Sequence, residues 1–509
     1  MKKVIIRTTE EIENWRRNIN SEINFIPTMG NLHNGHIKLI STAKNDNSNV
    51  NLVSIFINPL QFDNKLDLEN YPKTIDNDIK ISFSNGADVI FIPSNEEIYP
   101  PNKNIKFLKA PIELSSALCG LNRIGHFDGV CTVVYRLLNL IKPKNLYLGE
   151  KDWQQLLILK NLVLKNNLSV AIKSIPTQRD FDGIPLSSRN INLSKNERKL
   201  IRFFSSELFE AKKNFQQEKK INLNEIIKKL SAKKISIEYL EHLHPHTLQK
   251  ARFKDNISLL AGAIKCGETR LIDHVFLMKR RPIIAIDGPA GSGKSTVTKL
   301  IAKKLKLLYL DTGAMYRALS WLILKEGIDY KKEKKLQNIL KDISIVFKSH
   351  TNSHQDVFIN NRCVTEEIRS QEISSIVSKI SSIKEVRKFL VEEQRKIGKS
   401  GGLVAEGRDI GTTVFPHAEL KIFLTASIDE RAKRRKSDTN SKDSQEIDLH
   451  TLKELIKKRD FEDSNREISP LIKANNAIEI ITDGYSINEV VDKIIDLYYD
   501  KIPKETEIE

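Results

Sequence analysis

The stretch GPAGSGKS, at residues 288–295, decides the fold of the second half of this chain of 509 residues. It matches the pattern GxxxxGK[ST], whose glycines let backbone N–H groups approach phosphate groups closely at the start of a helix. The apolar segment IIAID (283–287) precedes the motif, and TVTKLIAKKL (296–305), which has a helical pattern, follows it. A strand, a glycine-rich loop and a helix in this order predict a P-loop domain that binds ATP.

The chemistry of a P-loop assigns roles to its last residues. Lys294 is expected to reach the β- and γ-phosphates, and Ser295 to hold the Mg²⁺ ion that accompanies ATP. The predicted ATP-binding residues of this loop are Gly288, Pro289, Ala290, Gly291, Ser292, Gly293, Lys294, Ser295 and Thr296. A P-loop does not identify the acceptor of the phosphate, so the acceptor must be inferred from the rest of the domain.

Arginines form an unusual group in this part of the chain: Arg317, Arg369, Arg387, Arg408, Arg431, Arg459 and Arg466. Any one arginine is most often a solvated surface charge, but a phosphorylated acceptor needs several positive groups around it. Most of them occur in LDTGAMYR (310–317), IRSQE (368–372), AEGRDIGT (405–412) and RDFEDSNR (459–466). These segments, in this order, resemble the signature segments of bacterial cytidylate kinases, and the resemblance covers residues from about 281 to 500.

The resemblance implies a kinase that transfers phosphate from ATP to CMP or dCMP. The implied CMP-binding residues are Arg317, Arg408, Arg459 and Arg466 for phosphates, Asp463 for the ribose, and Ser378, Arg387 and Asp409 for cytosine. The last three suit the base, because a carboxylate accepts from the N4 amino group of cytosine and would repel the oxygen of uracil. Thr312 and Glu406 stand where the family often has serine and aspartate, and both keep the functional group.

The first half of the chain alternates apolar runs with helical patterns. The runs are INFIP (23–27), VNLVSIFI (50–57), ADVIFIP (87–93) and NLYLG (145–149). This alternation predicts a doubly wound α/β sheet of buried parallel strands. A second region, 176–279, contains the lysine-rich helical stretch 198–217 and ends in two strand-like runs, ISLLAGAIK (257–265) and TRLIDHVFLM (269–278).

The segment PTMGNLHNGH (27–36) follows the first of these strands and opens a helix. Two histidines with a glycine between them at a helix start can approach a triphosphate and stabilise the charge on leaving pyrophosphate. Metal binding is an alternative, but no cysteine or carboxylate partners cluster nearby. Ordinary capping of the helix by the histidines is the other alternative.

Further segments with polar groups also follow predicted strands. They are NPLQF (58–62), GEKD (149–152) with Gln155 one helical turn later, and LSSRN (186–190). In open α/β sheets, ligands bind beyond the carboxyl ends of the strands, so these segments are expected to form one site. Their amide, ammonium and hydroxyl groups suit ATP and a carboxylate substrate.

In order along the chain, PTMGNLHNGH, NPLQFD, YPKT, EIYP, GHFDGVCTVV, GEKD and PLSSRN resemble the pantothenate synthetase (pantoate–β-alanine ligase) family. The resemblance covers residues from about 1 to 279 and implies a reaction of two steps. The pantoate carboxylate attacks the α-phosphate of ATP, giving pantoyl adenylate and pyrophosphate. The amine of β-alanine then displaces AMP and gives pantothenate.

The same resemblance implies the residues of this site. His33, His36 and Lys151 are the catalytic residues, as Lys294 is in the kinase. The residues that contact ATP are Met29, Gly30, Asn31, Leu32, His33, Asn34, Gly35, His36, Gly149, Glu150, Lys151, Asp152, Gln178, Leu186, Ser187, Ser188 and Arg189. Gln61, Gln155 and Asn58 bind pantoate and β-alanine. His36 is the family's assigned proton donor, although binding of phosphate would give the same motif.

The expected fold is therefore α/β throughout. Residues 1–175 form a Rossmann-like ATP- and pantoate-binding domain of the HxGH nucleotidyl-transferase type, and residues 176–279 form a small α+β subdomain. Residues 280–509 form a P-loop nucleoside monophosphate kinase, with a nucleotide-binding insert at about 316–400 and a lid at about 430–466.

The net charge of +17, from 82 Lys and Arg against 65 Asp and Glu, is explained by basic clefts that attract phosphorylated small molecules. Nucleic-acid binding is an alternative, but no long basic run is interleaved with aromatic residues. A further alternative is that only one half is catalytic and the other is a structural or regulatory module. The chemical groups of both halves are present, which favours two ATP-using enzymes on one chain.

The four cysteines, Cys119, Cys131, Cys266 and Cys363, are scattered and form no CxxC pair. This spacing disfavours a disulfide framework or a zinc site and is typical of a reducing cytosol. The N-terminus lacks the apolar core of a signal peptide, and no apolar run is long enough to span a membrane. We therefore expect a cytoplasmic protein without membrane partners, and the resemblance implies a homodimer through the N-terminal half.

Overall fold

The computed structural model describes residues 3–45, 49–63, 65–102, 104–218, 220–267, 269–330, 332–349, 355–437 and 448–507. The chain forms two compact units. Unit 1 comprises Met1–Lys279 together with Pro503–Glu509, and unit 2 comprises Arg280–Ile502. Unit 1 thus includes residues 503–507, which the sequence analysis places in the kinase.

The main sheet of unit 1 has six parallel strands in the order β1-β4-β3-β2-β5-β6. They are β1 (Val4–Ile6), β2 (Ile23–Thr28), β3 (Val50–Ile55), β4 (Val89–Phe91), β5 (Asn145–Gly149) and β6 (Ala171–Ile175). The four predicted strands are all present and form the centre of the sheet. The two edge strands were not expected, because β1 is very short and β6 is only half buried.

Helices cover both faces of this sheet, as in a doubly wound fold. The longer ones are α1 (Thr9–Arg17), α2 (Asn34–Lys44), α4 (Ile75–Ser84), α8 (His126–Ile141) and α9 (Trp153–Lys165). Phe25 and Leu52 belong to the core with α1, α8 and α9, whereas their neighbours Ile26 and Val53 belong to the core with α2. Successive residues of a strand point to opposite faces of the sheet. Because these strands carry apolar residues on both sides, they form a hydrophobic core on each face.

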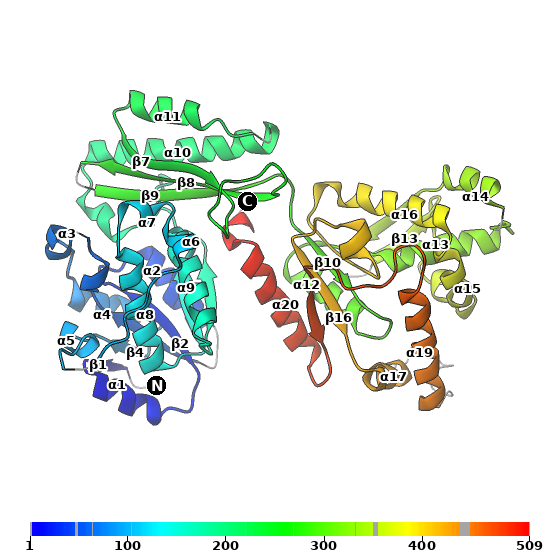
Figure 1. Ribbon diagram of the computed structural model, residues 1–509, viewed down its shortest axis with the longest axis horizontal. Helices are drawn as coiled ribbons and strands as arrows, with labels where there is room; N and C mark the ends of the chain where they lie inside the picture. Colours follow the sequence, from blue (N-terminus) through cyan, green and yellow to red (C-terminus); the bar gives the residue numbers. More distant parts are fainter. Residues whose placement is uncertain are drawn as a thin grey trace. The chain divides into compact units, whose positions relative to one another are not determined.

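A second sheet in unit 1 is antiparallel and carries helices on one face (Figure 1). Its strands are β7 (Ser236–Leu243), β8 (Ile257–Cys266) and β9 (Thr269–Met278), and its helices are α10 (Lys195–Glu218) and α11 (Leu223–Ala232). The ring of Phe204 on α10 lies so close to Gly262 that a Cβ there would be 2.8 Å from it. This is the predicted α+β subdomain, with β7 as an additional strand.

Unit 2 is built on a parallel sheet in the order β11-β15-β10-β16-β17. The strands are β10 (Ile283–Asp287), β11 (Leu308–Asp311), β15 (Leu403–Gly407), β16 (Leu420–Thr425) and β17 (Ile478–Ile481). Its main helices are α12 (Lys294–Lys304), α13 (Thr312–Lys325), α16 (Lys384–Ile397), α17 (Ile428–Ser437), α19 (Leu449–Ser464) and α20 (Ile487–Lys501). The strand before the P-loop is thus the central one.

The predicted insert of unit 2 contains a small antiparallel sheet. It consists of β12 (Ile345–Ser349), β13 (Gln355–Ile359) and β14 (Arg362–Cys363), with α14 (Glu333–Leu340) and α15 (Gln371–Ser381) nearby in sequence. In the predicted lid, α17 packs against α19, and residues 438–447 between them lie outside the described residues.

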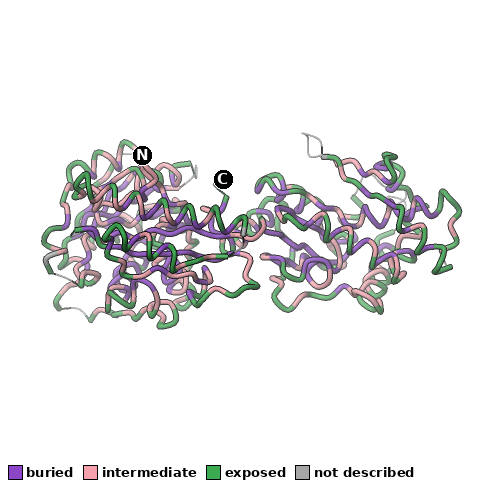
Figure 2. Tube along the Cα trace, turned by 90° about the horizontal axis from the view of Figure 1, so that it is seen from above, coloured by how far each residue is buried: buried purple, intermediate pink, exposed green. Residues whose placement is uncertain are grey.

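In both units the central strands of the parallel sheet are buried, while many helix and loop residues are exposed (Figure 2). No helix within the described ranges combines the length and the apolar character needed to cross a membrane.

Two candidate nucleotide sites

A buried carboxylate holds the loop that carries the two histidines of unit 1. Asp78 on α4 is 0% exposed and accepts hydrogen bonds from the backbone N–H groups of Asn31 at 2.9 Å and Leu32 at 2.8 Å. Gly30 has a φ of +83°, and a Cβ there would lie 3.0 Å from Asp78 Oδ2. Asp78 was not predicted from the sequence. The one sequence feature that pointed to this position was Thr74 of the YPKT segment, whose hydroxyl donates to Asp78 at 3.1 Å.

The histidine rings are oriented by backbone donors. His33 Nδ1 accepts from the N–H of Gly35 at 3.1 Å, and His36 Nδ1 accepts from the N–H of His33 at 3.3 Å. The ring centroids are 4.2 Å apart. A neutral imidazole that accepts at Nδ1 carries its proton on Nε2. Each ring can therefore donate one hydrogen bond from Nε2 to an anion. His33 also caps α2, as the capping alternative expected, and the binding of phosphate by the histidines stays a prediction.

Both histidines are uncharged at neutral pH. Burial, and then the nearby Lys151, lowers the pKa of His33 to about 4. Burial, and then His33, lowers the pKa of His36 to about 3. A general acid needs a pKa near the operating pH, so this environment favours hydrogen bonding to phosphate over proton donation by His36.

The low pKa of His36 predicts that unit 1 loses stability in acid. The unfolded chain, with a histidine pKa of about 6.5, binds more protons than the folded chain below that pH. The stability that uncharged His36 contributes to unit 1 is therefore fully present above pH 6.5 and is lost as the pH falls toward the folded pKa of about 3. Between pH 7 and pH 5, His36 should account for about 2 kcal/mol of the unfolding free energy.

Denaturant unfolding of unit 1 at the two pH values measures this effect. The variant His36→Gln should reduce the pH dependence by that amount, whereas His417→Gln, at an exposed position in unit 2, should not change it. If the unfolding free energy of His36→Gln depended on pH as strongly as that of the unaltered protein, His36 would not be the source of the stability loss in acid.

A cavity of about 290 Å³ lies beside the histidines. Of the predicted residues, its walls contain Met29, His33, Gly35, His36, Asn58, Gln61, Gly149, Lys151, Asp152, Gln155, Gln178, Leu186, Ser187, Ser188 and Arg189. A wider cavity of about 750 Å³ shares Lys151 and Gln155 with it and reaches β9. Segments far apart in sequence thus meet beyond the carboxyl ends of the parallel strands. Gly30, Asn31, Leu32 and Asn34 are not in the walls and shape the loop behind them.

Gln61 is positioned by neighbours that sequence reasoning missed. His126 Nδ1 lies 2.7 Å from the Gln61 carbonyl oxygen, and Arg123 donates to the same oxygen at 3.1 Å. Asn58 is buried and donates to the Gly129 carbonyl at 3.1 Å and to the Gln61 side chain at 3.2 Å. The amide of Asn58 therefore holds Gln61 at the cavity wall, and its own contact with substrate stays a prediction.

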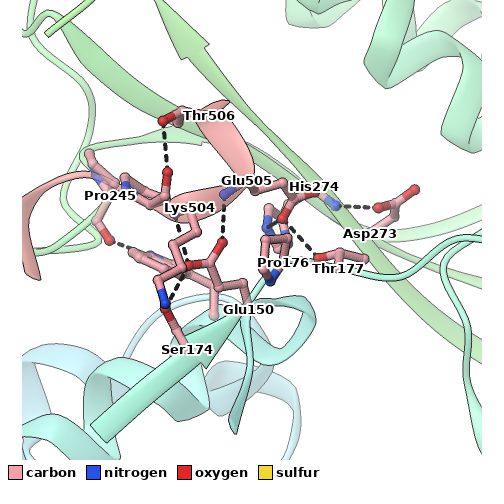
Figure 3. A network of polar contacts seen from close by, with 12 residues as sticks. Glu150, Ser174, Pro176, Thr177, Pro245, Asp273, His274, Lys504, Glu505 and Thr506 are labelled. Carbon is pink, nitrogen blue, oxygen red and sulfur yellow. Dashed lines mark hydrogen bonds and ion pairs between the residues drawn. The ribbon is translucent and has the colours of Figure 1, made fainter. Parts of the chain in front are cut away.

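Glu150 is not where the sequence prediction places it. Its carboxylate lines neither cavity and is buried instead against Ser174, whose hydroxyl donates at 2.8 Å. The backbone N–H groups of Lys504 and Glu505 also donate to it, at 2.9 and 2.8 Å (Figure 3). Because three protein donors occupy this carboxylate, contact of Glu150 with ATP is not supported.

The P-loop of unit 2 depends on its glycines. At Gly288 the φ is +154°, and a Cβ would lie 2.0 Å from the carbonyl oxygen of Leu424 on β16. Gly291 and Gly293 have φ values of +76° and +85°. These backbone conformations strongly favour glycine, and they leave N–H groups at the start of α12 for a phosphate.

Lys294 is the buried cation of this loop. Its Nζ donates to the Pro289 carbonyl at 2.7 Å, so its ammonium group lies within the loop that is expected to surround the phosphates. Burial, and then the neighbouring Arg408, lowers its pKa. A phosphate would relieve both effects, because it supplies the missing negative charge.

Ser295 faces a carboxylate. Its hydroxyl donates to Glu406 at the end of β15 at 2.9 Å, and Glu406 also accepts from the hydroxyl of Tyr309. No cluster of three or more histidine, cysteine or acidic residues suited to a metal occurs among the described residues. Mg²⁺ in kinases usually takes one or two protein ligands and completes its shell with phosphates and water, so Ser295 and Glu406 are a suitable donor set.

The predicted phosphate-binding arginines share acidic partners. Arg408 donates to Asp463 at 2.8 Å, and Arg466 lies 3.7 Å from the same carboxylate. Arg317 donates to Asp311 at 3.0 Å. The structure thus brings Arg408, directly after β15, and Arg466, just beyond α19, together around Asp463, while their contact with phosphates stays a prediction.

Arg459 differs from these arginines. Within the described part of unit 2, its guanidinium makes neither a hydrogen bond nor an ion pair. Burial, and then Arg408, lowers the pKa of Arg459, and burial, and then Arg387, lowers that of Arg466. The cluster therefore has more positive charge than its carboxylates neutralise, which is the electrostatic condition for binding an anion.

Two of the three predicted cytosine-binding residues meet. Arg387 is 2% exposed and donates to Asp409 at 2.5 Å and to the Ser381 carbonyl at 3.1 Å. Ser378 lies on α15, one turn before Ser381, and is exposed. Within the described residues it makes no contact with Arg387 or Asp409. The buried pair is therefore preformed, while the role of Ser378 stays a prediction.

The geometry defines an enzyme with two nucleotide sites: a site of the HxGH nucleotidyl-transferase type in unit 1 and a P-loop nucleoside monophosphate kinase in unit 2. Residues 4–276 match the family Pantoate-beta-alanine ligase, and residues 284–500 match the family Cytidylate kinase. The chain belongs to the bifunctional pantoate ligase/cytidylate kinase family. It is a ligase and a kinase on one chain.

Close relatives span the whole chain. A protein of Prochlorococcus marinus (strain MIT 9215) with the name bifunctional pantoate ligase/cytidylate kinase is 93% identical over 100% of both chains. One from strain MIT 9301 with the same name is 91% identical over 100% of both chains. A pantoate-beta-alanine ligase from Francisella tularensis, solved with beta-gamma ATP and beta-alanine, is 37% identical. It matches 54% of this chain and 98% of its own, with a TM-score of 0.47.

Proposed function

We propose that the unit 1 site activates the carboxylate of (R)-pantoate with ATP and transfers the pantoyl group to β-alanine. The observation that carries this proposal is the pair of uncharged histidines that share one cavity wall with Lys151. Nε2–H groups and an ammonium group can stabilise the negative charge that develops when pantoate oxygen bonds to the α-phosphorus and pyrophosphate leaves.

In the second step the amine of β-alanine attacks the carbonyl carbon of pantoyl adenylate, the amide bond forms and AMP leaves with the bonding electron pair. Gln61 and Gln155 line the same cavity and are the proposed contacts for pantoate and β-alanine. His126 and Arg123 bond the backbone carbonyl of Gln61, and Asn58 donates to its side-chain oxygen at 3.2 Å, so its amide is held in place before substrate arrives.

We propose that unit 2 transfers the γ-phosphoryl group of ATP to CMP or dCMP. The P-loop binds ATP, the phosphate donor. The arginine cluster around Asp463 binds the phosphate of CMP and the γ-phosphate of ATP, which approach one another during the transfer. Arg459, whose guanidinium has no hydrogen-bond partner within the described residues, supports this assignment, because phosphoryl transfer depends mainly on positioning and charge neutralisation. Asp409 would accept from the cytosine amino group, with Arg387 fixing its carboxylate.

Mg²⁺ is the proposed metal of this site. Ser295 and Glu406 would hold it, directly or through water, beside the phosphates. The ion would neutralise charge on the phosphates, while Lys294 and the loop N–H groups position them.

We also propose a cytoplasmic location and a homodimer formed through unit 1. All four cysteines are free, which suits a reducing compartment. The dimer rests on the resemblance of unit 1 to pantothenate synthetases.

A paired product assay on the full-length chain tests the proposal. With ATP, pantoate and β-alanine it should form pantothenate, AMP and pyrophosphate, and with ATP and CMP it should form CDP and ADP. CMP should be a better acceptor than UMP, because Asp409 would repel the uracil oxygen. A chain that forms only one set of products would support the alternative in which one half is structural or regulatory.

A further inference from the structure

The chain ends in a segment that returns to unit 1 after unit 2 is complete. We call Pro503–Glu507 the C-terminal tail. Lys504–Glu507 forms a single 3-10 turn, and Thr506 is buried with its hydroxyl donating to the Pro503 carbonyl at 2.7 Å. The tail lies beyond both family matches, which end at residues 276 and 500. It is therefore part of neither matched catalytic domain.

The first contact of the tail is with Glu150. Two of the three donors to this buried carboxylate are the tail N–H groups of Lys504 and Glu505, and the third is Ser174 (Figure 3). Burial raises the pKa of Glu150, so its charged form depends on these donors. Loss of the tail would leave the carboxylate with one of them.

The second contact is made by the carboxylate of Glu505. It accepts from the Thr177 hydroxyl at 2.8 Å, and it lies 3.3 Å from His274 Nε2 and 3.7 Å from Arg179. Burial acts to raise the pKa of Glu505, but His274 and Arg179 outweigh it and hold the pKa below its ordinary value. Glu505, whose side chain is 14% exposed, is thus a mostly buried anion that bridges separate segments of unit 1.

These segments are the ones that form the ligase cavities. Glu150 directly precedes Lys151, and Thr177 lines the cavity and directly precedes Gln178. His274 lies on β9 and lines the wider cavity. The tail therefore joins the ends of β5 and β6 in the parallel sheet to a strand of the antiparallel sheet (Figure 3).

We propose that the C-terminal tail is a positioning element of the ligase site, and that Glu505 and the tail N–H groups hold the Lys151 and Gln178 segments in place for ATP. This inference rests on the proposed ligase function of unit 1. Glu505 lines neither cavity, so it is a positioning residue and not a catalytic one. The C-terminal tail would then be needed by the ligase and not by the kinase.

Ending the chain after Ile502 tests the proposal. The truncation should lower kcat/KM for ATP in pantothenate formation about tenfold, because displaced phosphate-binding groups lose their preorganised geometry. CMP phosphorylation should change less than twofold, because unit 2 ends at Ile502. Equal ligase kinetics with and without the tail would overturn the proposal.

Substitutions in the full-length chain separate positioning from folding. Glu505→Ala should raise KM for ATP and leave KM for β-alanine unchanged, whereas Glu507→Gln, a charge change at an exposed tail position, should change neither. A fall in kcat with both KM values unchanged would mean only that fewer molecules are folded, and would overturn the positioning role.

A double-mutant comparison tests whether the tail acts through Glu150. Glu150→Gln and the truncation should each lower ligase activity, and together they should lower it no further than the larger single effect. Full additivity of the two effects would overturn the link between the tail and Glu150.

Hydrogen exchange provides a readout that does not depend on activity. Backbone amides of residues 149–152 and of Thr177 and Gln178 should exchange faster in the truncated chain and in Glu505→Ala than in the unaltered protein or Glu507→Gln. Unchanged exchange in both variants would overturn the proposal even if unit 1 had a different reaction. Absence of pantothenate formation by the unaltered chain, with faster exchange in the variants, would count against the ligase function alone.

Discussion

Replacing Lys294 with alanine is expected to lower kcat for CMP phosphorylation about a thousandfold and to leave pantothenate formation unchanged. Lys294 is the buried cation of the P-loop, and its Nζ is already bonded to a loop carbonyl. Removing one preorganised group that stabilises transition-state charge lowers kcat about 10²- to 10³-fold, and a P-loop lysine contacts both the γ-phosphate that is transferred and the β-phosphate that it leaves. The measurement is CDP formation at saturating ATP and CMP, with pantothenate measured on the same preparation.

Lys303→Ala is the matched control for this experiment. Lys303 lies on the same helix, α12, but is exposed. It should retain the kinase activity of the unaltered chain. Kinase activity of Lys294→Ala within tenfold of the control would contradict the assigned role, and loss of both activities would show that the two sites are coupled.

Replacing His36 with alanine is expected to lower kcat for pantothenate formation about 10²- to 10³-fold, because it removes one Nε2–H donor from the proposed pyrophosphate site. CMP phosphorylation by the same preparation is the internal control and should be unchanged. The exchange of labelled pyrophosphate into ATP in the presence of pantoate measures the first step alone and should fall by the same factor.

His36→Gln distinguishes the two roles that the motif leaves open. The amide of glutamine can donate from a position near that of Nε2 but cannot act as an acid near neutral pH. If His36 binds phosphate as a neutral donor, the glutamine variant should retain far more activity than the alanine variant. Equal loss in both variants would favour proton transfer by His36.

Local sequence patterns were sufficient for much of the architecture. The four apolar runs of the first half became the central strands β2 to β5, and the P-loop followed the central strand β10 of unit 2. Such runs are informative because strands of a parallel sheet are buried on both faces. Edge strands such as β6 are half buried and lack this pattern, so they were missed.

Several residues that shape the sites could not be identified from the sequence. Asp78 and Asp287 are both buried carboxylates that accept backbone N–H groups of loops far along the chain, at Asn31 and Leu32 and at Ile410 and Gly411 respectively. An isolated aspartate in a helical or strand segment has no motif. Its role depends on which loop the fold brings to it.

The sequence by itself determined the chemical groups of both sites, because a P-loop or an HxGH loop needs its residues at fixed spacing on one short segment. Tertiary structure alone decided which of those groups face a ligand. Glu150 has the same place in its motif whether it turns to ATP or to the protein interior. It turns inward because the N–H groups of Lys504 and Glu505 reach it from the far end of the chain, and a buried carboxylate is stable only where donors meet it.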